Sequence, residues 1–293
     1  MNFFQYVIDA LSLGGLYAIA ALGIGFTFGV MRLVNFAYGE YYMLGAYALL
    51  FFRTLPLPLM LLLMVAFVII VALGTERVVF RPLRNANPVT MLIASFALSV
   101  LFRQTVMIRS NNNLEALDLS DTLREQFSIG TLRIPKIDAL TIAGTIVILA
   151  GLALFFRKTV IGIQMRAVAE NFRMARLLGV RVNMVIATTF GISGGLSAVV
   201  AILIVAKTGM PTPTIGVQIL LFGLIAAVIG GARSLAGAAL GGFIVGALSV
   251  MLEAFLPIDL RLYRDAILCV ILVGTMWFRP HGIIPGPGSE ERA

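Results

Sequence analysis

The chain has 293 residues, of which 60% are hydrophobic and 12% are charged, and its mean hydropathy is +1.00. This composition has too little polar surface for a water-soluble globular protein, so that class is excluded. The formal net charge of +8 would suggest a nucleic-acid partner in a soluble protein. Here most arginines fall in loops predicted to be cytoplasmic, where positive-inside retention and anionic lipid account for them. The sequence therefore predicts an integral membrane protein.

Apolar stretches of about 20 residues recur along the chain, which is the length that a hydrocarbon core about 30 Å thick requires. They lack the alternating polarity of barrel strands and must satisfy their own backbone hydrogen bonds in lipid, so we expect helices. The predicted spans are 6–30, 38–52, 57–75, 88–108, 138–156, 184–206, 215–231, 236–255 and 264–279. The expected fold class is all-α: a polytopic helical membrane protein of eight to nine transmembrane helices, forming one transmembrane domain over residues 1–293.

The charges of the loops predict the orientation of the chain, because Lys and Arg are retained on the cytoplasmic side. Segment 76–84 has three arginines against one glutamate, and the 157–183 loop has five arginines and one lysine against Glu170, so both are expected to be cytoplasmic. The 109–137 loop balances its charges and is predicted to be extracytoplasmic. Nine spans place the N-terminus outside, whereas a break inside the membrane at 31–37 would give eight spans and an N-terminus inside.

Small residues recur at the four-residue spacing that lets helix backbones approach closely in lipid. These G-x-x-x-G pairs are Gly25/Gly29, Gly191/Gly195, Gly237/Gly241 and Gly242/Gly246. Glycine-rich helix packing is therefore expected. It is compatible with static packing and with helices that slide in an alternating-access cycle.

Residues that carry out chemistry are scarce in this chain. It has one histidine, His281, and one cysteine, Cys269, and it has no G-x-x-x-x-G-K-[ST] segment to hold a nucleotide. The lack of clustered His, Asp, Ser or Cys argues against a membrane enzyme. We therefore predict no catalytic residue, no metal site and no enzymatic activity on this chain.

The stretch MRLVNFAYGEYYMLGAY, residues 31–47, places polar residues between two apolar runs. If the helix breaks here, Asn35 can cap the segment that begins at Phe36 and leave a helix N-terminus that favours a substrate carboxylate. Glu40 could then meet an amino group beside a passage lined by tyrosines. Alternatively, Glu40 pairs with an arginine of a neighbouring helix. The predicted substrate-path residues are Asn35, Tyr38, Glu40, Tyr41 and Tyr42.

The cytoplasmic segment 157–180 has apolar residues at helical spacing with charged residues between them. This pattern predicts a short amphipathic helix that ends at Gly179, a plausible C-cap residue. Such a helix could lie at the lipid headgroups or fit a groove on a cytosolic partner, and its residues alone leave both possibilities open.

Five blocks stand out along the chain: NFAYGEYYMLGAY at 35–47, RPLR at 81–84, RAVAENFRMARLLGV at 166–180, GGARSLAGAALGG at 230–242 and FRPHGIIPG at 278–286. In these blocks and in their order, the chain resembles the membrane permease of branched-chain amino acid ABC importers, and the resemblance covers nearly the whole chain. Two positions depart from the family pattern. Tyr38 stands where many relatives have histidine, and Arg233 lies in a turn that is usually uncharged.

The resemblance implies a permease subunit of the bacterial inner membrane, forming an alternating-access path for branched-chain amino acids or related small solutes such as urea and amides. It implies cytosolic ATP-binding subunits that hold ATP and Mg²⁺, an extracytoplasmic solute-binding protein and a second permease subunit, with no cofactor on this chain. Segment 166–180 then corresponds to the helix that docks on the ATPase. The implied coupling residues are Arg166, Ala169, Glu170, Phe172, Arg173, Ala175, Leu178 and Gly179.

A secondary active transporter of amino acids, coupled to an ion gradient, is the alternative. That class usually has several intramembrane carboxylates for its coupling ion. Here only Asp9, Glu40 and Glu253 lie within or near the predicted spans.

Overall fold

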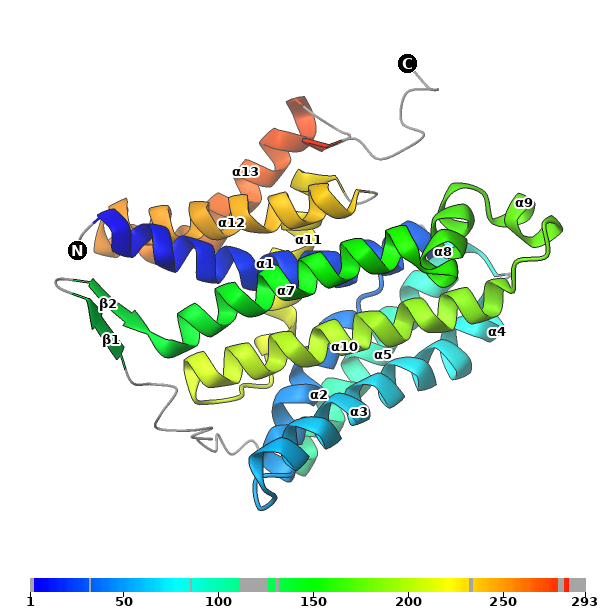
Figure 1. Ribbon diagram of the computed structural model, residues 1–293, viewed down its shortest axis with the longest axis horizontal. Coiled ribbons are helices and arrows are strands. Elements are labelled where there is room, and N and C mark those ends of the chain that lie inside the picture. The colour runs from blue at the N-terminus through cyan, green and yellow to red at the C-terminus, as the bar shows by residue number, and fades with distance from the viewer. Residues whose placement is uncertain are drawn as a thin grey trace. The chain divides into compact units, whose positions relative to one another are not determined.

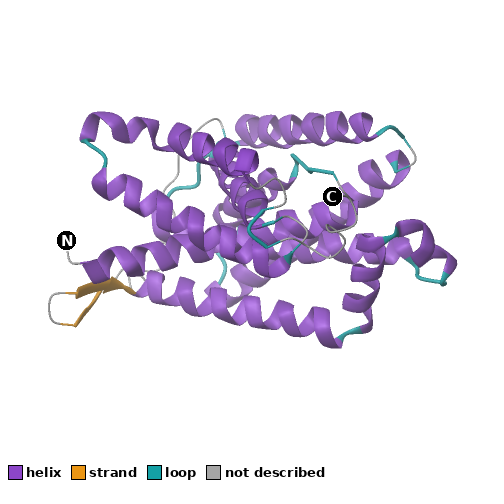
Figure 2. Cartoon of the chain, turned by 90° about the horizontal axis from the view of Figure 1, so that it is seen from above, coloured by secondary structure: helices purple, strands orange, loops and turns teal. Residues whose placement is uncertain are grey.

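The structure is a computed structural model that describes residues 3–31, 33–84, 86–110, 126–129, 132–231, 234–278 and 282–284. Most of the described residues are helical, as Figure 2 shows. The helices are α1 (Phe3–Met31), α2 (Tyr38–Phe51), α3 (Leu57–Thr75), α4 (Arg81–Leu83), α5 (Pro88–Arg109), α7 (Lys136–Lys158), α8 (Val160–Glu170), α9 (Phe172–Leu177), α10 (Val182–Thr208), α11 (Ile215–Gly230), α12 (Leu235–Phe255) and α13 (Arg264–Phe278). A π-helical turn, Glu76–Phe80, joins α3 to α4, and a 3-10 helix, Ile258–Tyr263, precedes α13.

The predicted all-α membrane class is confirmed. Each predicted span contains one helix, and six helical stretches among the described residues are long and apolar enough to cross a membrane. Helices α2, α11 and α13 have only 14, 16 and 15 residues, which at about 1.5 Å per residue is shorter than a core about 30 Å thick. The number of spans, eight or nine, therefore stays a prediction.

The only strands among the described residues form a short antiparallel hairpin in the predicted extracytoplasmic loop. Strand β1 (Gln126–Ile129) pairs with β2 (Leu132–Pro135), and α7 begins directly after β2. The hairpin and the start of α7 therefore lie at the same end of that helix, as Figure 1 shows.

The chain divides into two compact units. We predicted a single transmembrane domain, and that assignment stays a prediction. One unit contains residues 1–25, 120–152 and 221–293, and the other contains residues 26–119 and 153–220. The first unit includes most of α1 and α7 together with α12 and α13. The second unit includes α2, α3, α5, α8, α9 and α10, and it holds both predicted functional segments.

Within the first unit, α1 and α7 run in the same direction. The Ser12 hydroxyl donates to Asp138 Oδ1 over 2.7 Å, and a Cβ at Gly15 would meet the side chain of Thr145 one to two turns further along. An eight-span chain would have these two helices antiparallel, because α1 would then run outward and α7 inward. The parallel pairing puts the start of α1 at the hairpin end of α7, as the nine-span prediction expects. The break at 31–37 lies between the ends of α3 and α5, as the eight-span prediction expects, so the number of spans stays a prediction.

Two of the predicted glycine pairs make close helix contacts in the first unit. A Cβ at Gly237 or Gly241 would clash with the backbone of α11, and a Cβ at Gly242 or Gly246 would clash with the backbone of α1. These contacts confirm close packing at both pairs.

The predicted close contact at Gly191/Gly195 is wrong. A Cβ at Gly191 or Gly195 would lie 3.7 or 3.8 Å from its nearest neighbour, which is an ordinary contact. The close residue is Gly194, whose Cβ would lie 2.7 Å from the Cβ of Ala72 on α3. Gly29, from the predicted pair Gly25/Gly29, has nothing within 4 Å of such an atom. Spacing identified the right helix here but not the face that contacts its neighbour.

Gly194→Ala is expected to lower the free energy of unfolding by about 1–3 kcal/mol, because α10 must move away from α3 to admit a methyl group. Gly191→Ala is its matched control and should be neutral or gain up to about 1 kcal/mol in helix propensity. Thermal unfolding of both variants in detergent checks this difference. Equal shifts for the two variants would contradict the assigned contact face.

Candidate functional site

The break predicted after the first span is present in the second unit. Helix α2 begins at Tyr38, and Asn35 Oδ1 accepts a hydrogen bond from the Ala37 N–H over 3.0 Å. The Asn35 carbonyl also accepts from the Tyr38 N–H over 3.2 Å. Asn35 therefore satisfies backbone donors in the turn before α2. The helix starts at Tyr38, where the span was predicted to begin and two residues after the Phe36 start that the capping hypothesis assumed.

The break lies at the depth of the neighbouring helices rather than beyond their ends. The Phe36 N–H donates to the Ser95 hydroxyl of α5, and Ser95 lies seven residues, or roughly 10 Å, into that helix. Tyr41 on α2 shares a hydrogen bond of 2.5 Å with Thr75 of α3, eight residues before the helical stretch ends at Leu83. An interrupted helix at this depth is the kind of element that transporters use near a translocation path.

Glu40 is 1% exposed and forms an ion pair inside the second unit. Its Oε1 accepts from the Ser99 hydroxyl over 2.7 Å and from Arg103 Nη2 over 2.5 Å. Its Oε2 has no hydrogen-bond partner in the described part of the chain. Of the two roles predicted for Glu40, the structure shows the second, an ion pair with an arginine of a neighbouring helix. Contact of Glu40 with a substrate stays a prediction.

Sequence reasoning missed the partners of Glu40, which lie on one face of α5. Ser95, Ser99 and Arg103 are four residues apart, a spacing that places them on the same side of a helix. All three interact with the segment 36–40. Three polar residues at this spacing within an apolar span are a signal that this face of α5 is polar, although they do not indicate which helix the face meets.

The predicted passage tyrosines are packed in the interior in this structure. Tyr38, Tyr41 and Tyr42 are all 0% exposed, and the Tyr38 ring lies edge-on to the other two. The Tyr38 hydroxyl donates to the Ser193 carbonyl over 3.4 Å. Lining a path therefore requires a conformation in which α2 separates from its neighbours, and that role stays a prediction.

The segment 157–180, which we predicted to be cytoplasmic, forms two helices, so the prediction of one amphipathic helix is wrong. Thr159 caps α8 by accepting from the Gly162 N–H, and Asn171 caps α9 by accepting from the Met174 N–H, both over 3.0 Å. The backbone of Asn171 is extended, with φ −147° and ψ 101°. An asparagine side chain that caps a new helix competes with continuation of the old one, which explains the break. Figure 1 shows α9 as a separate short helix beyond α8.

The predicted C-cap at Gly179 is confirmed. Gly179 has φ +82°, and its N–H donates to the Arg176 carbonyl over 3.2 Å. The Val180 N–H donates to the Ala175 carbonyl over 3.1 Å. These two bonds form a Schellman motif, which fixes where the chain leaves α9.

Gly179→Val should destabilise the end of α9 by about 1–2 kcal/mol, because a β-branched residue is strained at positive φ. Gly179→Asn, which tolerates this conformation, is the matched control and should retain most of the stability. Limited trypsin digestion at the arginines of 166–181 measures the difference, since a frayed α9 is cleaved faster. Equal digestion rates for the two variants would contradict a structural role of this cap.

The predicted coupling residues divide into a buried set and an exposed set. Ala175 of α9 is buried, as are Met165 and Val168 of α8, whereas Val160 and Ile163 of α8 are exposed. The exposed apolar residues between Phe172 and Leu178, which we call the α9 surface, are Phe172, Met174, Leu177 and Leu178. Leu177 and Leu178 are each 77% exposed. Of the remaining coupling residues, Arg166, Glu170, Arg173 and Gly179 are exposed and Ala169 is partly buried.

Two of the sequence blocks contact each other in the first unit. The Ile283 and Ile284 N–H groups donate to the carbonyls of Ile229 and Gly230 over 2.9 and 3.1 Å. Residues 283–284 of the tail block are therefore held against residues 229–230, where the block at 230–242 begins. Arg233 and His281, which we singled out in these blocks, lie outside the described residues.

Comparison with known proteins identifies the family. The family model described as "Branched-chain amino acid transport system / permease component" matches residues 6–276. The chain belongs to this permease family. The family resemblance drawn from the five sequence blocks is thus confirmed, and the chain is a multi-pass membrane protein of a family of transport permease components.

Curated relatives of this permease match it over almost its whole length. The high-affinity branched-chain amino acid transport system permease protein BraD of Pseudomonas aeruginosa is 33% identical, over 99% of this chain and 98% of the relative. The corresponding LivH proteins of Salmonella typhimurium and Escherichia coli are 30% identical over the same shares. A solved structure of an inward-facing conformation of a proposed metal-chelate type ABC transporter has a TM-score of 0.53 at 16% identity, covering 94% of this chain and 85% of the other. That likeness concerns the fold alone.

Proposed function

We propose that this permease is the transmembrane subunit of an ATP-binding-cassette importer of the bacterial inner (plasma) membrane. It forms an alternating-access path for branched-chain amino acids or related small solutes such as urea and amides. Separate cytosolic subunits bind ATP and Mg²⁺ and hydrolyse the ATP, so the permease itself carries no cofactor and catalyses no reaction. The names of BraD and LivH, both branched-chain amino acid permeases, support this substrate class.

The observation that carries the proposal is the α9 surface. Four large apolar side chains are exposed on a loop whose charge predicts a cytoplasmic location, and the exposed residues Arg173 and Arg176 stand between them in the sequence. A contiguous apolar group with a polar rim is typical of a protein interface. Helix α9 therefore supplies the contact with the ATPase, while α8 anchors it through its buried residues.

The substrate path passes the α2 break, where Asn35, Tyr38, Glu40, Tyr41 and Tyr42 lie. A free amino acid is a zwitterion, so it presents an ammonium and a carboxylate to the path. The Glu40 carboxylate and the Arg103 guanidinium can accept these two charges, and they neutralise each other when no substrate is present. Mutual neutralisation matters because an unpaired charge within the membrane is costly.

Two further partners complete the importer. An extracytoplasmic solute-binding protein delivers substrate at the 109–137 and 207–214 surfaces. A second permease subunit, identical or related, pairs with this one so that two ATPases can act together.

Gentle detergent extraction of the tagged permease, followed by mass spectrometry of the retained proteins, tests the proposal. We expect two ATPase subunits and a second permease to be retained, and Arg166→Glu or Glu170→Arg to release the ATPases. A permease that purifies alone and, in proteoliposomes, concentrates amino acids along an ion gradient would instead be a secondary active transporter.

A further inference from the structure

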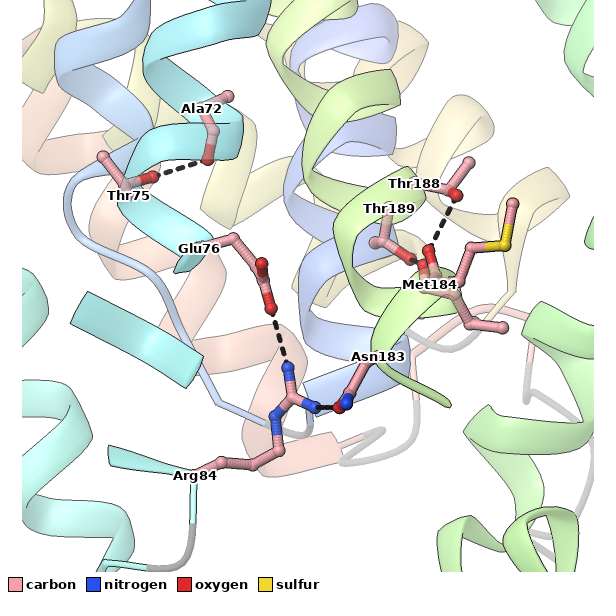
Figure 3. Close-up of polar contacts among 9 residues, drawn as sticks. Ala72, Thr75, Glu76, Arg84, Asn183, Met184, Thr188 and Thr189 are labelled. Atoms are coloured by element: carbon pink, nitrogen blue, oxygen red, sulfur yellow. Dashed lines mark hydrogen bonds and ion pairs between the residues drawn. The ribbon is translucent and has the colours of Figure 1, made fainter. Parts of the chain in front are cut away.

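A cluster of three polar residues connects two helices beside the α8–α9 segment. Arg84 follows α4, and its Nη2 donates to Glu76 Oε1 over 2.7 Å. Its Nη1 donates to Asn183 Oδ1 over 2.5 Å. Figure 3 shows the guanidinium of Arg84 between the two acceptors, one on the continuation of α3 and the other at the start of α10. The proposed function uses none of these three residues.

Glu76, the acceptor on the α3 side of the cluster, lies in a buried and ordered position. Glu76 is buried and begins the π-helical turn Glu76–Phe80. Such turns are rare in helices and occur frequently at functional sites. A buried carboxylate needs a cation close to it, so Arg84 is held at this turn by electrostatics as well as by hydrogen bonding.

Asn183, the acceptor on the α10 side, is joined to α9 by a short stretch of chain. Asn183 is the second residue of α10 and lies six residues after Leu177, the last residue of α9. The capping turn at Gly179 joins the two helices. A displacement of α9 therefore reaches Asn183 through a short and ordered connection.

The cluster also adjoins the α2 break. Thr75, directly before Glu76, shares a hydrogen bond with the Tyr41 hydroxyl, and Tyr41 follows Glu40 in α2. Contacts thus run without interruption from α9 through Asn183, Arg84 and the α3 turn to the Glu40–Arg103 pair. All of these residues belong to the second unit.

We propose that Arg84 is a positioning residue that couples movement of α9 to movement of α3 and α2. This inference rests on the proposed function, in which an ATPase moves α9. Arginine suits the role because its planar guanidinium can hold two acceptors at once in a fixed geometry. A lysine has one ammonium on a flexible stem, so it can pair with Glu76 without also holding Asn183.

The test compares Arg84→Lys, Asn183→Leu and the double variant in the complete complex in proteoliposomes. The quantity measured is the amount of leucine moved per ATP hydrolysed. We expect a drop of about fivefold or more for each single variant, and no further drop for the double variant, because both break the same connection. ATP hydrolysis and thermal stability should stay close to those of the unmodified complex.

Two matched variants separate coupling from packing. Thr188→Ala removes a hydroxyl that donates to the Met184 carbonyl of the same helix (Figure 3), so it should leave the amount of leucine moved per ATP hydrolysed unchanged. Asn183→Asp keeps an acceptor for Arg84 and should also retain the ratio. If Arg84→Lys fails to assemble, the pair Asn183→Leu and Asn183→Asp decides the question.

An unchanged ratio in assembled Arg84→Lys and Asn183→Leu complexes would overturn the inference. So would an equal drop in Thr188→Ala or Asn183→Asp. Failure of the proposed function gives a different result, because the unmodified complex itself would then show no uptake driven by ATP.

Discussion

Leu178→Asp is expected to release the ATPase subunits from the purified permease and to abolish uptake. Leu178 is 77% exposed, so the substitution should cost the isolated permease little stability. In the complex it would place a carboxylate in the apolar centre of the interface, which charged residues normally avoid. Loss of such a central contact weakens binding by at least about 30-fold. The amount of ATPase retained on the tagged permease, measured across an ATPase concentration series, gives this change.

Val160→Asp is the matched control. Val160 is the first residue of α8 and is 69% exposed, and a negative charge is favourable at a helix N-terminus. This variant adds the same charge to the same segment, 157–180, but outside the α9 surface. It should retain the ATPase. Release by both variants would mean that added negative charge, and not the α9 surface, determines binding.

Glu40→Gln is expected to abolish uptake while the complex still assembles. The substitution removes the carboxylate that would meet a substrate ammonium and leaves Arg103 unpaired. Since Arg103 is 30% exposed, we expect a loss of about 1–3 kcal/mol in stability, below that of a fully buried pair. Uptake of leucine by reconstituted complexes and thermal unfolding of the same samples measure the two effects.

The double variant Glu40→Gln/Arg103→Gln distinguishes a transport role from a structural one. With both charges removed, most of the lost stability should return, because no unpaired charge remains. Uptake should not return, because neither charge of the substrate finds its partner. Full uptake by a normally assembled Glu40→Gln complex would contradict a substrate role for this pair.

The spans and the break before α2 could be predicted from sequence because they depend on local properties. Span length follows from the thickness of the hydrocarbon core, and the polar residues of 31–47 interrupt an apolar run. Gly179 was recognised in the same way, since a helix that ends at glycine is a local pattern. The break at Asn171 was equally local and was missed, because the apolar spacing continues across it and conceals the cap.

The partners of the functional residues could not be predicted because they are far apart in sequence. Arg103 is 63 residues from Glu40, and Asn183 is 99 residues from Arg84. Periodicity shows which face of a helix is polar, but not which helix that face meets. The same limit explains why spacing selected Gly191 and Gly195 when Gly194 is the residue in close contact with α3.

Uptake into proteoliposomes tests the importer function most directly. One preparation contains the permease with its second permease and ATPase subunits, with ATP and Mg²⁺ at the ATPase face and leucine delivered by the solute-binding protein. A second preparation contains this permease alone under a proton or sodium gradient. We predict that leucine accumulates in the first preparation only and that accumulation stops when ATP is omitted. Accumulation by the permease alone along an ion gradient would contradict an importer that depends on ATPase subunits.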